Sequence, residues 1–216
     1  MSSLRLYTYY RSSASYRVRI ALNLKGLTYE AIPVHLRRDG GEHHSAAYAA
    51  RNPAELVPVL QDDALTLTQS LAIIEYLEEL HPRPALLPGP SAQRAHIRAL
   101  ALAVACDIHP LGNLRVLQYL QSIGLDDARR QQWSQHWVTH GLQIIEQLLQ
   151  QAGSRGRCCV GDTPTLADCC LVPQLFNAER IGCDLSQVPS LQEIYAHCLT
   201  LEPFQRAAPA AQPDAE

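Results

Sequence analysis

The segment LRLYTYYRSSASYRVRIALNLKG, residues 4–26, defines how the fold begins. Its first part, Leu4 to Tyr9, is short, aromatic-rich and partly alternating, which is typical of a strand. A polar break from Arg11 to Ser15 follows, and apolar residues then recur at helical spacing from Tyr16 to Leu24 and end at Gly26. The segment therefore predicts strand, loop and helix in this order.

The next elements extend this unit into a small sheet. Tyr29 to Val34 reads as a second strand, so the first unit is predicted to be βαβ, whose strands are normally parallel. Val57 to Leu60 and Leu65 to Leu67 predict two short strands joined by a tight turn at Asp62-Asp63. A helix from Ser70 to about His81 follows. The first third of the chain is thus predicted to be βαβ followed by ββα.

The richest turn signal in the chain separates two domains. The stretch from Pro82 to Pro90 contains four prolines and Gly89, which is typical of a linker. We therefore expect a first domain over residues 1–81, a linker over 82–90 and a second domain over 91–216. The first is expected to be α/β.

The second domain is expected to be all helical. Helical periodicity predicts four long helices, over residues 93–122, 126–151, 165–181 and 190–201. The last residues, 207–216, are small, polar and proline-containing, and we expect them to be loosely ordered.

Composition restricts the possible partners and location. The chain has 18 Lys plus Arg and 21 Asp plus Glu, and this net charge of −3 predicts no general attraction to nucleic acid or anionic membranes. The N-terminus lacks an apolar signal core, and the longest apolar run, Ala99 to Cys106, is too short to span a membrane. The seven cysteines form no C-x-x-C spacing, so we expect free thiols, no metal site and a cytoplasmic location.

The start of the first helix is the strongest candidate site. Arg11 to Arg19 places several hydroxyls and amides at a helix N-terminus, whose unpaired N–H groups and positive dipole end favour an anion such as a thiolate. Hydrogen bonds and the dipole lower a thiol pKa, so that the nucleophilic form exists at neutral pH. The loop contains no cysteine, so the thiolate would come from a ligand. The alternative is that Ser12, Ser13 or Ser15 only caps the helix.

Three other segments carry local signals. Val57-Pro58 could be a cis peptide that presents the valine backbone to an extended peptide. Ser70, after Gln69, is a natural N-cap at a helix end that could receive a carboxylate, or could cap only. Thr165 and Asp168 have capping-box-like spacing, which we interpret as structural.

Together these segments resemble the zeta class of the glutathione transferases over nearly the whole chain. The class signature, S-S-C followed by a spacer and R-V-R-I-A, stands here as SSASYRVRIA at residues 12–21. The other matches are Asp39-Gly40-Gly41, Asn52-Pro53, Val57-Pro58, residues 69–79 and Asn177-Ala178-Glu179-Arg180. One departure is Ala14, which replaces the usual cysteine and favours a mechanism in which glutathione supplies the only thiol.

The resemblance implies a thioredoxin-like glutathione-binding domain, a helical domain with the acceptor-substrate site, and a homodimer. It implies that Ser12 hydrogen-bonds the glutathione sulfur with support from Ser13, that Val57 pairs with the tripeptide backbone, and that Gln69 and Ser70 hold the γ-glutamyl end. The full set of residues expected to bind glutathione is Ser12, Ser13, Ala14, Ser15, Tyr16, Arg17, His43, Val57, Gln69, Ser70, His109 and Asn113. At His43 and His109 the family's glutamine is replaced by histidine.

The resemblance also implies glutathione-dependent cis–trans isomerisation of maleylacetoacetate to fumarylacetoacetate. Arginine binds carboxylates bidentately, so Arg11, Arg115 and Arg180 are the candidates for binding this diacid. We expect Ser12, Ser13 and Arg11 to be the catalytic residues. The alternatives are maleylpyruvate or an α-haloacid as substrate, or a glutathione-binding stress protein without turnover.

Overall fold

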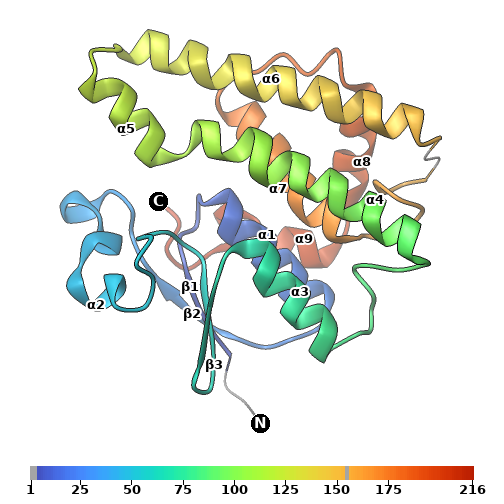
Figure 1. Cartoon of the computed structure of the whole chain (residues 1–216), viewed down its shortest axis with the longest axis horizontal. Coiled ribbons are helices and arrows are strands. Elements are labelled where there is room, and N and C mark those ends of the chain that lie inside the picture. The colour runs from blue at the N-terminus through green and yellow to red at the C-terminus, as the bar shows by residue number, and fades with distance from the viewer. Residues whose placement is uncertain (1–3, 154–155) are drawn as a thin grey trace. The chain divides into compact units, whose positions relative to one another are not determined.

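A computed structural model describes residues 4–153 and 156–216, which form two compact units (Figure 1). One unit contains the chain up to Leu86 together with Leu201–Glu216, and the other is Leu87–Thr200. The proposed second domain ran to residue 216, whereas the last 16 residues belong to the first unit.

The first unit is built on a four-stranded mixed sheet. Its strands are β1 (Arg5–Thr8), β2 (Glu30–Pro33), β3 (Val59–Asp62) and β4 (Leu65–Thr68), in the order β2-β1-β3-β4. β1 and β2 are parallel, as the βαβ prediction required, whereas β1 pairs with β3, and β3 with β4, in antiparallel register.

Helices cover both faces of this sheet. Successive side chains of a strand point to opposite faces, so Tyr7 and Thr8 mark the two sides. The Thr8 hydroxyl accepts a hydrogen bond from Arg19 of α1 (Ser13–Leu24), which packs beside α3 (Ser70–Leu80). The ring of Tyr7 contacts Tyr48 of α2 (Ala46–Ala49), with 6.3 Å between centroids. α1 and α2 therefore lie on opposite faces.

A buried ion pair binds residues 81–86, which follow α3, to the first unit. Lys25 Nζ lies 2.7 Å from Glu78 Oε2 and also donates to the carbonyls of His81 and Pro84, at 2.6 and 3.1 Å. Glu78 in turn accepts the Leu86 N–H at 2.9 Å. The first half of the proposed linker is therefore bound to the first unit.

The C-terminal segment packs on α1. Its short helix α9 (Glu202–Ala207) contacts α1, and Asn23 donates to the Pro203 carbonyl at 3.0 Å. Further along, Gln212 is buried and Asp214 accepts a hydrogen bond from the Tyr10 N–H. The expectation of a loosely ordered tail over 207–216 is wrong, because these polar side chains satisfy backbone groups of the same unit.

The described residues of the second unit form helices joined by loops, and no strand lies among them. Its α-helices are α4 (Ser91–Leu102), α5 (Leu114–Ser122), α6 (Asp127–Gln151), α7 (Leu166–Arg180) and α8 (Pro189–Leu199). The single helix expected over residues 93–122 is wrong. A π-helical turn (Ala103–Ile108) and a 3-10 turn (His109–Gly112) separate α4 from α5, and Pro110, which has no N–H to donate, lies in this break.

The helical stretch Ser91–Ser122 is long and apolar enough to cross a membrane by length and composition alone. It has 32 residues, and its most apolar window has a mean hydropathy of 1.3 and is 22% buried. Helices of soluble proteins meet the same criterion, and this stretch includes the irregular turns around Pro110. The finding is therefore weak evidence for a membrane span.

Candidate functional site

The sheet register brings three of the predicted segments to one edge of the first unit. Tyr7 of β1 is paired with Val59 of β3, so the residues after β1 run beside the residues before β3. Val59 is also paired with Thr68, the last residue of β4. The loop to Ser12, the Val57-Pro58 peptide and the start of α3 therefore share this edge.

The N-terminus of α1 has the geometry expected of an anion site. Ser12 is the N-cap, and its hydroxyl oxygen accepts the Ser15 N–H at 3.2 Å while its own hydrogen can still donate. Ser13 and Ala14 form the half-buried first turn, which contains no acidic residue. Arg11 is exposed beside this turn, with its guanidinium carbon 5.9 Å from the Tyr10 ring centroid.

Arg17 connects α1 with the start of α3. Its side chain is buried, and Nη1 donates to the Ser70 hydroxyl at 3.3 Å. Ser70 is the first residue of α3, and the N-cap is Gln69, which has a φ of 69°. The predicted cap is thus displaced by one residue, but both side chains still lie at a helix N-terminus without an acidic residue in its first turn.

Two polar side chains support the Val57-Pro58 peptide, which is cis. The carbonyl of Leu56 accepts hydrogen bonds from the Tyr48 hydroxyl and from Asn52 Nδ2, both at 2.7 Å. Val57 itself is buried in a cluster that includes Tyr7 and Tyr48. The Asn52-Pro53 motif therefore acts indirectly, by fixing the residue before Val57.

His43 is the buried residue of a 3-10 turn, Glu42–His44, whose other two residues are exposed. Its ring lies against that of His44, with 3.9 Å between centroids and an interplanar angle of 38°, and His44 Nδ1 lies 2.6 Å from Glu55 Oε2. Gly41 has φ of 110°, and a Cβ there would collide with the His43 imidazole, which explains the glycine. Burial lowers the pKa of His43, so the imidazole is neutral at neutral pH.

Not every residue of the signature faces this edge. Tyr16 is buried, and its hydroxyl donates to the Phe204 carbonyl of α9 at 3.5 Å. Ser15 is fully buried in the first turn. These two side chains pack within the unit and are not presented at the edge formed by Ser12, Val57 and Ser70.

The sequence interpretation missed Arg19, which supports the loop before Ser12. This fully buried guanidinium donates to the carbonyls of Tyr9 and Tyr10 at 3.3 and 2.9 Å, and to that of Ala207 at 3.0 Å. Burial lowers the pKa of Arg19 to about 10, so it stays charged at neutral pH. The sequence held one signal for this role, because Arg19 lies within an apolar helical run. A charge buried in such a run normally needs hydrogen-bonding partners.

Four of the predicted residues lie in the second unit. His109 lies in the 3-10 turn, and Asn113 caps α5 by accepting the Arg115 N–H at 3.3 Å. Arg115 is exposed on α5. Arg180 is exposed at the end of α7 and donates to Asn177 Oδ1 at 2.6 Å.

The predicted capping box at the start of α7 is confirmed. Both Thr165 and Asp168 make its reciprocal hydrogen bonds, and the buried Asp168 carboxylate also accepts the Cys159 N–H at 2.8 Å.

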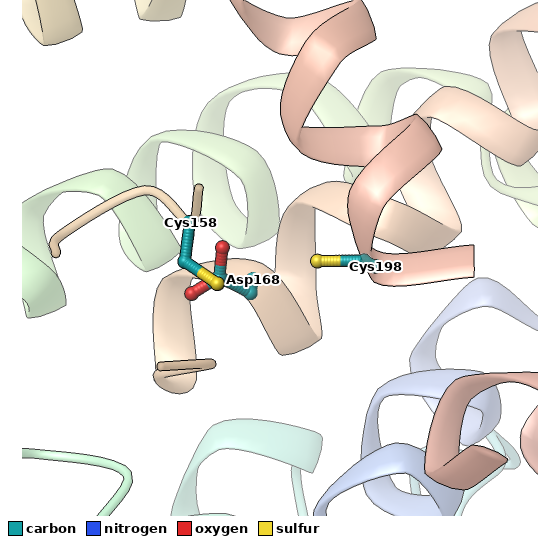
Figure 2. Close-up of side chains that lie close together, drawn as sticks. All are labelled: Cys158, Asp168 and Cys198. Atoms are coloured by element: carbon teal, nitrogen blue, oxygen red, sulfur yellow. The ribbon is translucent and has the colours of Figure 1, made fainter. Parts of the chain in front are cut away.

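Figure 2 shows two thiols, Cys158 and Cys198, beside Asp168, with ligand atoms within 4.8 Å of one another. The hydrogen bond that the Cys198 thiol donates to Cys158, together with burial, raises the pKa of Cys198, and a protonated thiol is a poor metal ligand. Because the carboxylate is already used by the capping box, we assign this cluster to the structure of the second unit.

The site on the first unit fits a peptide-like anion. It combines two helix N-termini, hydroxyl donors at Ser12 and Ser70, the buried cation of Arg17 and the backbone beside Val57. Helix N-termini favour thiolates and carboxylates, and an extended backbone can pair with a second one. The arrangement can therefore bind a thiol-bearing peptide and lower the pKa of its thiol.

Comparison with known proteins points to the same chemistry. Residues 6–85 match the model of the glutathione S-transferase N-terminal domain. A probable maleylacetoacetate isomerase of Vibrio cholerae is 52% identical over 216 residues, which is all of both chains.

Two solved structures are similar throughout. A bacterial maleyl pyruvate isomerase, described as a zeta-class glutathione S-transferase, has a TM-score of 0.95 and 49% identity, and 98% of this chain and 100% of that chain are covered. A maleylacetoacetate isomerase of Anaeromyxobacter dehalogenans with bound glutathione has a TM-score of 0.88 and 45% identity, and 100% and 99% are covered. Identity of this extent, together with the thioredoxin-like sheet and the Ser12 loop, establishes that the chain belongs to the zeta class of the glutathione transferases.

Proposed function

We propose that this protein is a glutathione-dependent cis–trans isomerase that converts maleylacetoacetate to fumarylacetoacetate. The observation that carries the proposal is the convergence of Ser12, Val57 and Ser70 at one edge of the sheet, where two helix N-termini meet the Val57-Pro58 peptide. The full-length relative named a probable maleylacetoacetate isomerase supports the choice of reaction.

Each end of glutathione is assigned to a different part of this edge. The Ser12 hydroxyl donates to the sulfur, and the amides of Ser13 and Ala14 add the positive end of the α1 dipole. Gln69 and Ser70 bind the γ-glutamyl carboxylate, and the peptide beside Val57 pairs with the cysteinyl backbone. His43, His109 and Asn113 remain candidates for binding glutathione on the family resemblance alone.

When bound, glutathione supplies a nucleophilic thiol whose reversible addition to the cis double bond allows rotation, so the cofactor is regenerated. Arg11 lies beside the thiol-binding turn and binds one substrate carboxylate, where its charge also stabilises the enolate that develops. Arg115 and Arg180 are the candidates for the second carboxylate. The residues of the chain therefore orient the diacid and stabilise charge, and no thiol of the protein takes part.

Maleylpyruvate is the second candidate substrate. The similarity to the zeta-class maleyl pyruvate isomerase is as extensive as that to the maleylacetoacetate isomerases, so sequence identity does not separate the two diacids. Both substrates have a cis double bond conjugated to a carbonyl group, and both carry a carboxylate at each end of the molecule. The same site residues would serve either.

The test is the ultraviolet absorbance of maleylacetoacetate with the purified protein, coupled to fumarylacetoacetate hydrolysis. It is run with no glutathione, with substoichiometric glutathione and beside maleylpyruvate. Complete conversion at substoichiometric glutathione, with the higher kcat/KM for maleylacetoacetate, is the expected result. A preference for maleylpyruvate would move the assignment to that substrate, and no turnover of either would favour an α-haloacid substrate or glutathione binding alone.

The assembly and location belong to the same proposal. Large apolar side chains are exposed on the second unit, among them Leu102, Tyr119 and Ile123. These side chains are accessible to a second subunit, and we expect a cytoplasmic homodimer. A monomer in sedimentation equilibrium at micromolar concentration would contradict the dimer.

A further inference from the structure

The peptide group of Tyr10 is held from both sides. Its N–H donates to Asp214 Oδ2 at 2.9 Å, and its carbonyl accepts from Arg19 Nη2 at 2.9 Å. Arg19 Nη1 also donates to the Tyr9 carbonyl, which in turn accepts the Ser12 N–H at 3.0 Å. The turn from Tyr9 to Ser12 thus has its backbone groups fixed by two side chains that are not part of it.

One of these side chains comes from the other end of the sequence. Asp214 is 204 residues from Tyr10, and the C-terminal segment reaches it through contacts along α1. Arg19 Nε donates to the Ala207 carbonyl at 3.0 Å, and the Tyr16 hydroxyl donates to the Phe204 carbonyl.

The position of the Ser12 hydroxyl depends on this turn. Ser12 follows Tyr10 by two residues, and its N–H closes the turn, so a change in the Tyr10 peptide would move the hydroxyl relative to a bound thiol. We propose that Asp214 is a positioning residue that holds the Tyr10 peptide, and thereby the Ser12 hydroxyl, in the geometry that stabilises the glutathione thiolate. This inference rests on the proposed function of the Ser12 loop.

Three variants of the full-length protein separate the possible roles of Asp214. Asp214→Ala removes the acceptor of the Tyr10 N–H, whereas Asp214→Asn keeps an acceptor oxygen and removes only the charge. Glu216→Gln is the matched control, because Glu216 belongs to the same segment but contacts Arg38 and His35 instead. Asp214 is half-buried, and thermal unfolding checks that each variant folds.

Two readouts distinguish positioning from general stability. The first is the pKa of enzyme-bound glutathione, followed by thiolate absorbance. The second is the affinity for S-methylglutathione, which has no thiol and depends on the remaining contacts. Asp214→Ala is expected to raise the bound-thiol pKa and to lower kcat by about 10- to 100-fold, since a misplacement of ~1 Å can cost about 100-fold in rate. S-methylglutathione affinity should not change, and Asp214→Asn and Glu216→Gln should resemble the wild type.

An unchanged bound-thiol pKa in Asp214→Ala would overturn the proposal. It would also be overturned if Asp214→Asn were as impaired as Asp214→Ala, or if S-methylglutathione affinity fell in parallel with kcat. The thiol titration needs no isomerase substrate. A wild-type protein that lacks isomerase turnover but binds glutathione would therefore refute the proposed reaction while leaving this inference open to the same measurement.

Discussion

Replacement of Ser12 gives the sharpest test of the site, because this residue has two separable roles. Its oxygen accepts the Ser15 N–H as the cap of α1, and its hydrogen is assigned to the glutathione sulfur. Ser12→Ala removes both interactions. Ser12→Asp keeps the cap, but an ionised carboxylate cannot donate to the sulfur and adds a negative charge beside it. Ser12→Thr keeps both the cap and the hydroxyl donor.

The expected magnitudes follow from these contacts. A hydrogen bond to a charged group contributes about 1.5–3 kcal/mol, and one pKa unit corresponds to about 1.4 kcal/mol. Because the hydroxyl stabilises the anionic form, its loss in Ser12→Ala should raise the bound-thiol pKa by about 1–2 units. Loss of the cap should cost about 1 kcal/mol of stability, which lowers Tm by about 2–4 °C for a chain of this size.

The assay is the pH dependence of kcat/KM together with thermal unfolding. Below the bound-thiol pKa, kcat/KM of Ser12→Ala should fall about 10- to 100-fold, and the difference should disappear at a pH above both pKa values. Ser12→Asp should unfold at the wild-type temperature but be at least as inactive as Ser12→Ala, and Ser12→Thr should retain activity. Wild-type turnover by Ser12→Ala at neutral pH would refute the thiolate-stabilising role.

Three further predictions concern stability. Lys25→Met should lower the free energy of unfolding by about 3–5 kcal/mol in chemical denaturation, because the buried Glu78 carboxylate loses its partner. A double replacement with Glu78→Leu removes that unpaired charge and should recover part of the loss, although the Leu86 N–H then lacks its acceptor. No recovery would argue against the pair. Asp168→Ala should lower the free energy of unfolding by about 2–4 kcal/mol, because the Thr165 and Cys159 amides lose their acceptor. The kinetics per folded molecule should not change, and altered kinetics would contradict a structural role. Burial lowers the pKa of His43 in the folded protein below that in the unfolded chain. The contribution of the neutral imidazole to stability is therefore complete above the unfolded pKa, near 6.5, and is lost as the pH falls through the folded pKa. The Tm of His43→Asn should fall less than that of the wild type between pH 7 and pH 5, and equal decreases would contradict this.

Local signals in the sequence located most elements. The strand, turn and helix expected from residues 4–26 appear as β1, the Ser12 turn and α1, and the capping box of α7 is present as expected. These features depend on neighbouring residues, since a cap or an alternating run acts within a few positions. The expected helix over 93–122 failed because Pro110 breaks the hydrogen-bond ladder that periodicity alone does not register.

The family of the protein, its α/β and helical parts and the anion-favouring helix start at Ser12 could all be predicted from the amino-acid sequence. Three features became visible only in the folded chain: Val57 and Ser70 share an edge with Ser12, Arg19 binds the carbonyls of the loop, and the C-terminal segment returns to the first unit, where Asp214 accepts the Tyr10 N–H. The difference lies in the sequence separation of the interacting residues. Capping and periodicity are set by residues within one or two turns, whereas sheet register and the satisfaction of buried polar groups depend on partners that can lie anywhere along the chain.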